Sequence, residues 1–262
     1  MIEHTLVSAL DGAANSWCAQ HGLATTYSDI TLLVPPVRLS VDYASAIALQ
    51  LSARCKTDPL VTAGEFSSLL LTALPSNFAE VTVTAPGFLN FAITTRALAD
   101  ALSNVFKVCS LADGFPLDAA RRSSSALQRK LSSIIIAATE PRLDSHNVAQ
   151  LPAIIDDATS LLAELGDDAR SLQLLVEDKD VVQLRAVIMA LSDAIFSITH
   201  NSPDLRDKSY ALYTRVDGVL RGSAIISPTR GVTLLRLAIC YASLHILATA
   251  QTMPPTADQT FV

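Results

Sequence analysis

Hydrophobic and polar positions with helical spacing mark three segments near the start of the chain. In residues 1–22, apolar side chains recur every three or four positions, and Gly22 supplies a C-terminal stop. A second helix is expected over residues 42–53, with Asp42 as its cap, because Asp is a preferred N-cap residue. A third is expected over residues 58–74, where an Asp-Pro pair begins the apolar period.

Two-residue alternation takes the place of the helical period in other segments of this region. Residues 30–34 form a short β-rich run that ends at a Pro-Pro pair. Valine and threonine alternate over residues 81–84, and after a Pro-Gly turn the alternation resumes, with Phe88 and Asn90 on one face. These last two runs are expected to form a β-hairpin.

Beyond residue 97 no convincing strand pattern occurs. Helices are expected instead over residues 97–108, 117–138, 151–165, 181–199, 205–220 and 228–252. The sequence therefore predicts an α+β N-terminal domain with a small antiparallel sheet, followed by an all-α helical bundle. The expected boundaries are residues 1–105 for the first domain, 106–145 for a helical linker and 146–262 for the bundle.

Composition is that of a globular protein with ample core, since 50% of the 262 residues are hydrophobic and 17% are charged. No apolar run approaches the roughly 20 residues of a membrane-spanning helix. The first eleven residues carry Glu3 and Asp11 but no Lys or Arg, which indicates neither a secretory signal nor a transit peptide. Four scattered cysteines without a C-x-x-C pair indicate buried thiols. We therefore expect a cytoplasmic protein with no metal and no membrane contact.

The net charge of −6 argues against a nucleic-acid partner, but the charges are unevenly distributed. Residues 156–180 hold eight acids against Arg170 and Lys179 and would repel phosphate. Residues 121–130 and 206–236 are basic. Two interpretations of these basic segments stay open, namely phosphate contacts and solvated helix faces.

Two motifs carry a resemblance to a known family. Residues 41–45 read V-D-Y-A-S, and residues 85–91 read A-P-G-F-L-N-F. Together they resemble the N-terminal tRNA-binding domain of arginyl-tRNA synthetases, where G-D-Y-A-x-N and G-P-G-F-I-N-F occur. The resemblance implies that Phe88 and Asn90 contact a D-loop base at the tRNA elbow. An aromatic ring can stack on such a base while a carboxamide reads its edge. On the residues alone, Phe88 as a core residue and Asn90 as a hairpin residue are equally good interpretations.

A weaker resemblance extends into the helical region. Residues 184–197 and 236–247 are similar to helices of the same family's C-terminal anticodon-binding domain, called the DALR domain. The basic residues Arg215, Arg230 and Arg236 are the candidate phosphate contacts there. Ordinary packing in a helical bundle also explains the apolar positions of both segments.

The catalytic domain that separates these two domains in the synthetases is missing from the sequence. No H-x-G-H turn, K-M-S-K-like loop or glycine-rich phosphate loop occurs, and the five histidines are dispersed. We therefore predict a non-catalytic paralogue without a cofactor, which binds arginine tRNA or a mimic as an accessory module. The alternative is a tRNA-binding shell recruited as a protein-interaction, structural or regulatory subunit without RNA binding, and the acidic residues 156–180 favour it.

Overall fold

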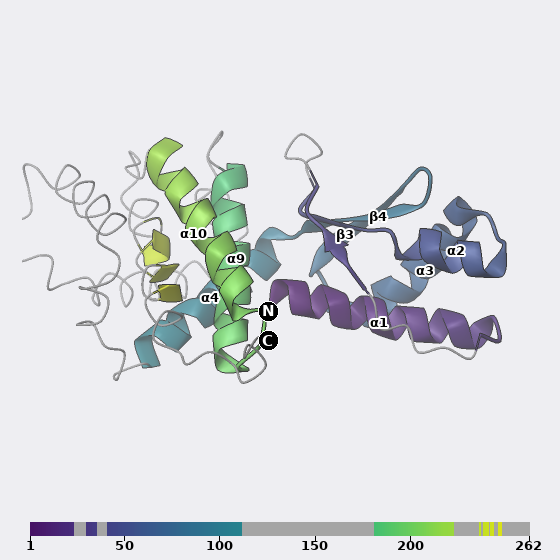
Figure 1. Ribbon diagram of the computed structural model, residues 1–262, viewed down its shortest axis with the longest axis horizontal. Coiled ribbons are helices and arrows are strands. Elements are labelled where there is room, and N and C mark those ends of the chain that lie inside the picture. The colour runs from purple at the N-terminus through teal and green to yellow at the C-terminus, as the bar shows by residue number, and fades with distance from the viewer. Residues whose placement is uncertain are drawn as a thin grey trace, which may run out of the picture. The chain divides into compact units, whose positions relative to one another are not determined.

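The chain divides into two compact units, Met1–Leu98 and Ala99–Val262. The computed structural model describes residues 1–23, 30–35, 41–111 and 181–222, together with residues 236, 238–240, 242–243 and 246–247 (Figure 1). All strands among these residues belong to the first unit.

The first unit contains a four-stranded antiparallel sheet with the strand order β1-β2-β4-β3. Its strands are β1 (Leu32–Leu33), β2 (Tyr43–Ser45), β3 (Ala79–Thr84) and β4 (Phe88–Ile93). β3 and β4 form the hairpin that the alternating pattern predicts, and β4 lies between β3 and β2. The small antiparallel sheet of the predicted α+β domain is thereby confirmed.

Three helices cover one face of this sheet. They are α1 (Ile2–Gln20), α2 (Ile47–Cys55) and α3 (Pro59–Ala73). α3 packs against β3 and β4, and both α1 and α2 pack against α3 (Figure 1). On β4 every second side chain is buried on this face: Leu89, Phe91 and Ile93. The other side chains of β4 point away from the helices.

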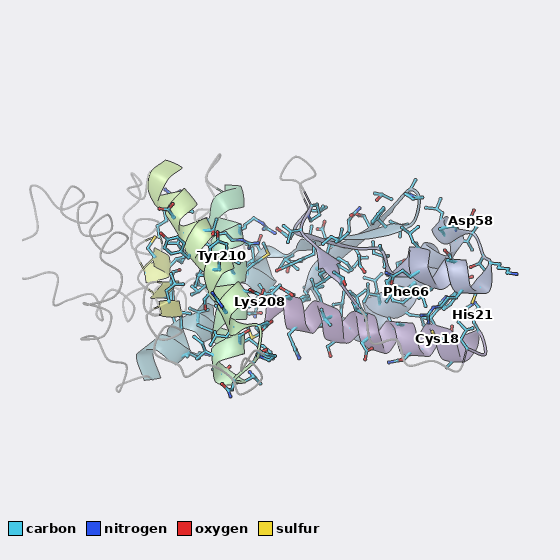
Figure 2. The ribbon with its side chains drawn as sticks, in the orientation of Figure 1. Cys18, His21, Asp58, Phe66, Lys208 and Tyr210 are labelled. Carbon is cyan, nitrogen blue, oxygen red and sulfur yellow. The ribbon has the colours of Figure 1, made fainter. Side chains whose placement is uncertain are left out.

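The start of α3 follows the local rule that its sequence predicts. Asp58 precedes the helix, and its carboxylate oxygen accepts hydrogen bonds from the backbone N–H groups of Leu60 at 2.7 Å and Val61 at 3.1 Å. Asp58 is labelled in Figure 2. Pro59 takes the first helical position, where a missing N–H is harmless. A cap of this type stabilises a helix by about 1 kcal/mol.

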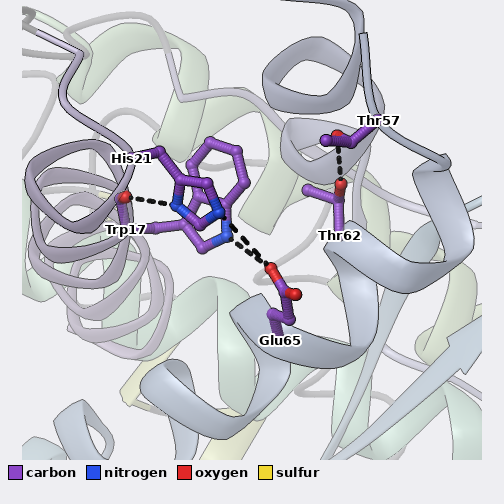
Figure 3. Close-up of polar contacts among 5 residues, drawn as sticks. All are labelled: Trp17, His21, Thr57, Thr62 and Glu65. Carbon is purple, nitrogen blue, oxygen red and sulfur yellow. Dashed lines mark hydrogen bonds and ion pairs between the residues drawn. The ribbon is translucent and has the colours of Figure 1, made fainter. Parts of the chain in front are cut away.

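A polar cluster joins the end of α1 to α3 (Figure 3). The Trp17 ring is fully buried, and its Nε1 donates to the Glu65 carboxylate at 3.3 Å. The His21 ring stacks on Trp17 with ring centroids 3.8 Å apart, and its Nε2 lies 3.7 Å from the same carboxylate. Next to this cluster, the hydroxyls of Thr57 and Thr62 are 2.8 Å apart. These contacts set where α1 ends relative to α3.

The prediction that Asp42 caps a helix is wrong. α2 begins only at Ile47, after strand β2, and its N-cap residue Ala46 makes no side-chain cap bond. The Asp42 carboxylate instead accepts from the backbone N–H of Ile93 at 2.7 Å, and the Asp42 N–H donates to the Phe91 carbonyl at 2.8 Å. Asp42 therefore fastens the start of β2 to the end of β4, a contact that local residue preferences do not encode.

The described residues beyond Ile93 form helices and turns without any strand, as the fold class predicts. The long helices are α4 (Thr95–Leu111), α9 (Val181–Thr199) and α10 (Leu205–Gly222), and α10 packs against α9. No helix in this described part combines the length and apolar content needed to cross a bilayer.

Several expectations lie outside the described residues. They are the helices over residues 117–138 and 151–165 and most of the helix over residues 228–252. The proposed linker and bundle boundaries stay predictions.

Candidate nucleic-acid interface

The turn between β3 and β4 is held tightly against the protein. The peptide bond between Ala85 and Pro86 is cis, and the Gly87 N–H donates to the Thr84 carbonyl at 2.8 Å. Gly87 is buried and has a φ of +146°, which L side chains rarely adopt. A β-carbon at this position would lie 2.9 Å from the Pro59 carbonyl oxygen. The glycine therefore permits close approach to protein backbone at the start of α3.

The face of the hairpin that points away from the helices is called the open face here. It contains three side chains from each strand: Glu80, Thr82 and Thr84 from β3, and Phe88, Asn90 and Ala92 from β4. The β3 side chains are exposed, and the β4 side chains are half-buried. Phe88 and Asn90 thus lie two positions apart on the same face, as the alternating sequence predicts.

Asn90 is oriented by its neighbour on the other strand. Its Nδ2 donates to the Thr84 hydroxyl oxygen at 2.9 Å. This bond uses one of the two N–H groups of the carboxamide. Within the described residues, the second N–H and the carbonyl oxygen are therefore the groups that can pair with a ligand. A carboxamide held in this way presents one donor and one acceptor, which is the pattern that reads the edge of a base.

Phe88 lies opposite Thr84 in the hairpin register and is half-buried. Its neighbours Leu89 and Phe91 fill the core beneath the helices. Phe88 is therefore not part of that fully buried core, and the residue is partly exposed to solvent.

The three basic candidates belong to the second unit. Arg215, on α10, is half-buried, and its guanidinium donates to the Ala186 carbonyl of α9 at 2.8 Å. Arg236 is only 8% exposed. Arg230 lies outside the described residues. The role of these residues in phosphate contacts stays a prediction.

Sequence reasoning did not single out three residues that the structure brings to notice. Thr84 orients Asn90, and its place across the turn could be anticipated from the hairpin register. Tyr210 (Figure 2) and Tyr213 lie on α10 and are 72% and 43% exposed. Their spacing on the helix, with Leu212 and Val216 buried, was a readable signal of an aromatic surface.

Burial limits the reactivity of two of the described thiols. Cys18 and Cys240 are buried, and Cys55 is half-buried. Burial raises the pKa of the Cys240 thiol to about 12, so the thiolate that acts as a nucleophile hardly forms near neutral pH. Among the described residues, no group of three or more His, Cys, Asp or Glu side chains could hold a metal ion.

Comparison with known families shows which type of domain the first unit resembles. Residues 1–93 match the family model of the arginyl tRNA synthetase N terminal domain. Searches among curated proteins and among solved structures find no match. The matched residues include α1, α2, α3 and all four strands, and they end at the last residue of β4. The chain therefore carries an arginyl-tRNA synthetase-like N-terminal domain, with Phe88 and Asn90 on the open face of its sheet.

Proposed function

We propose that this protein is a non-catalytic relative of arginyl-tRNA synthetase that binds tRNA, either an arginine tRNA or a mimic, as an accessory module. The observation that carries the proposal is the pair Phe88 and Asn90, which share the open face of a synthetase-like domain. The Phe88 ring would stack on an unpaired loop base, and the Asn90 carboxamide would read the edge of that base.

Three contacts support binding by this face because they make it rigid before any RNA arrives. Thr84 holds the Asn90 carboxamide, and Asp42 fastens the end of β4 through the Ile93 N–H. The hairpin turn is packed at Gly87. A preformed surface loses less conformational entropy on binding, so more of the interaction energy appears as affinity.

The proposed role is non-catalytic because the sequence lacks the nucleotide-binding motifs of a synthetase. In this proposal the helical unit acts as a DALR-like anticodon-binding bundle. Arg215, Arg230 and Arg236 would supply phosphate contacts there. A module that handles tRNA in this way would work in the cytoplasm.

A second candidate function is a protein-interaction, structural or regulatory subunit without RNA binding. It is favoured by the placement of the two described basic candidates, Arg215 and Arg236. Arg215 is engaged with the Ala186 carbonyl, and Arg236 is buried, so both guanidinium groups are used at least partly in packing. The net charge of −6 points the same way.

Filter binding of the full chain to arginine tRNA and to an unrelated tRNA, at two salt concentrations, separates the two functions. RNA binding predicts salt-dependent retention with a preference for one tRNA. Asn90→Ala should reduce that preference, because its carboxamide reads base edges. Ser68→Ala, an exposed change on α3, is the matched control and should leave it unchanged. Equal, weak and salt-insensitive retention of both tRNAs by the wild type would reject RNA binding.

A further inference from the structure

Strand β3 lies at the edge of the sheet, and its outer edge pairs with no other strand among the described residues. Just before the hairpin register begins, the Phe78 carbonyl accepts from the Thr94 N–H at 3.0 Å. Hydrogen-bonded and non-hydrogen-bonded pairs alternate along an antiparallel ladder. Because Phe78 bonds to Thr94, directly after β4, and the pattern repeats every two residues, Thr82 also directs its backbone groups toward β4. Val81 and Val83 direct theirs outward.

Three features that commonly prevent sheet edges from pairing, namely Lys, Pro and a β-bulge, are absent from this described strand. The strand reads A-E-V-T-V-T and contains neither Lys nor Pro, and its register with β4 is continuous, without a bulge. Val and Thr are the residue types that favour β-structure. Glu80 is its single charge.

We propose that the outer edge of β3 pairs with the same edge of a second copy of this chain. The two strands run antiparallel about a two-fold axis centred on Thr82. Val81 then faces the partner's Val83, and their outward backbone groups form hydrogen-bonded pairs. Thr82 faces the partner's Thr82 at a position where side chains are closest. The two sheets become one continuous sheet, with both open faces on the same side.

Charge placement is compatible with a second copy as the occupant and disfavours a register centred on Glu80. With the axis at Thr82, Glu80 faces the partner's Thr84, whose hydroxyl can donate to the carboxylate. An axis at Glu80 would set two carboxylates opposite each other, which is destabilising. An axis at Val81 would lose the Thr–Thr pair, and such pairs stabilise antiparallel sheets. The edge is thus complementary to itself, and this inference is independent of RNA binding.

Sedimentation of the full chain across a dilution series tests the contact, and two lysine substitutions test its register. Thr82→Lys sets two ammonium groups against each other and should raise the dimer dissociation constant at least about tenfold. Thr84→Lys sets an ammonium group against the partner's Glu80 and should lower the constant about threefold. Thr72→Lys, at an exposed position on α3, is the control and should leave it unchanged. A monomeric wild type, or lysine variants that shift the constant in the same direction, would overturn the proposal.

Cross-linking provides a second readout that does not depend on charge. Under mild oxidation, Thr82→Cys should form a disulfide-linked dimer, because the two introduced thiols would face each other at the axis. Thr84→Cys should not, since its two thiols would lie on opposite sides of the axis. The wild type under the same oxidant controls for native thiols. A dimer that sediments as such but fails to cross-link through Thr82→Cys would place the contact elsewhere and overturn the proposal.

Discussion

Gly87 packs so closely against Pro59 that a β-carbon on the glycine would come within 2.9 Å of the proline carbonyl oxygen. The contact joins the β3–β4 turn to the first residue of α3. It therefore sets the position of the hairpin, and with it the open face, against the helices that support the sheet.

Gly87→Ala should lower the free energy of unfolding by about 1 to 3 kcal/mol, because alanine would be strained at this φ and would press on backbone. Chemical denaturation measures the change. Gly64→Ala is the matched control, since a β-carbon at Gly64 meets nothing within 4 Å and the position lies inside α3. It should raise stability by roughly 0.5 to 1 kcal/mol. Equal effects of the two substitutions would contradict the packing argument.

Asp42→Ala should destabilise the protein by about 1 to 3 kcal/mol, because it leaves the Ile93 N–H without its acceptor. Amide hydrogen exchange should speed up at Ile93 and stay unchanged in the first turn of α2. Asp42→Asn retains an acceptor oxygen and should therefore lower the free energy of unfolding by less than Asp42→Ala. Asp58→Ala is the comparison, since its effect on exchange should fall on Leu60 and Val61 in α3. Faster exchange at the start of α2 after Asp42→Ala would restore the helix-cap interpretation.

The stability of the α9–α10 connection should depend on pH through Asp204. Burial alone would raise the pKa of Asp204, but hydrogen bonds from Ser202 and Ser197 and the charge of Lys208 together lower it below its ordinary 3.8. Because the folded pKa is depressed, the stabilisation is fully present above the unfolded value. It is lost as the pH falls through the folded value.

Comparison of the wild type with Asp204→Asn measures this effect. The difference in unfolding free energy should be about 1 kcal/mol or less near neutral pH, because the carboxylate is partly exposed. It should shrink once the pH falls below about 4. A difference that grows in acid would mean that the folded pKa is raised.

Phe88→Ala should weaken tRNA binding by about 1 to 3 kcal/mol if the ring stacks on a base. Phe88→Tyr keeps an aromatic ring and should retain most of the affinity. Both variants require a check by circular dichroism that the sheet is intact. An unchanged dissociation constant for Phe88→Ala would remove stacking from the proposed function.

Thr84→Val should reduce discrimination between tRNAs while leaving most of the affinity. Valine has nearly the shape of threonine but cannot accept the hydrogen bond from Asn90. Thr84→Ser keeps the acceptor and should behave as the wild type in competition binding. Equal discrimination by all three proteins would show that the orientation of Asn90 does not matter.

The purified chain should give no arginine-dependent ATP–pyrophosphate exchange above a control without enzyme. The expectation follows from the absence of nucleotide-binding motifs in the sequence. A signal that increases with protein concentration and disappears without arginine would reject the non-catalytic proposal.

Local pattern was sufficient for most of the secondary structure of the first unit, with strand β2 (Tyr43–Ser45) as the exception because it lies where a helix was expected. Val81 and Val83 alternate with threonine, and Phe88 and Asn90 alternate with core residues, because side chains of a strand point to opposite faces in turn. Asp58 and Pro59 mark the start of α3 because capping is satisfied within one turn of helix. The motif around Asn90 also indicated the family that residues 1–93 match.

Contacts between distant segments were decided only by the tertiary structure. Asp42 has the residue type of a helix cap, yet it binds Ile93, because pairing between β2 and β4 brings that N–H within reach. Gly87 allows a close approach, but its neighbour Pro59 lies on another element. Arg215 has the charge of a phosphate ligand, yet folding directs it to the Ala186 carbonyl. Residue type sets which bonds a side chain can make, and the packing of distant elements selects which of them form.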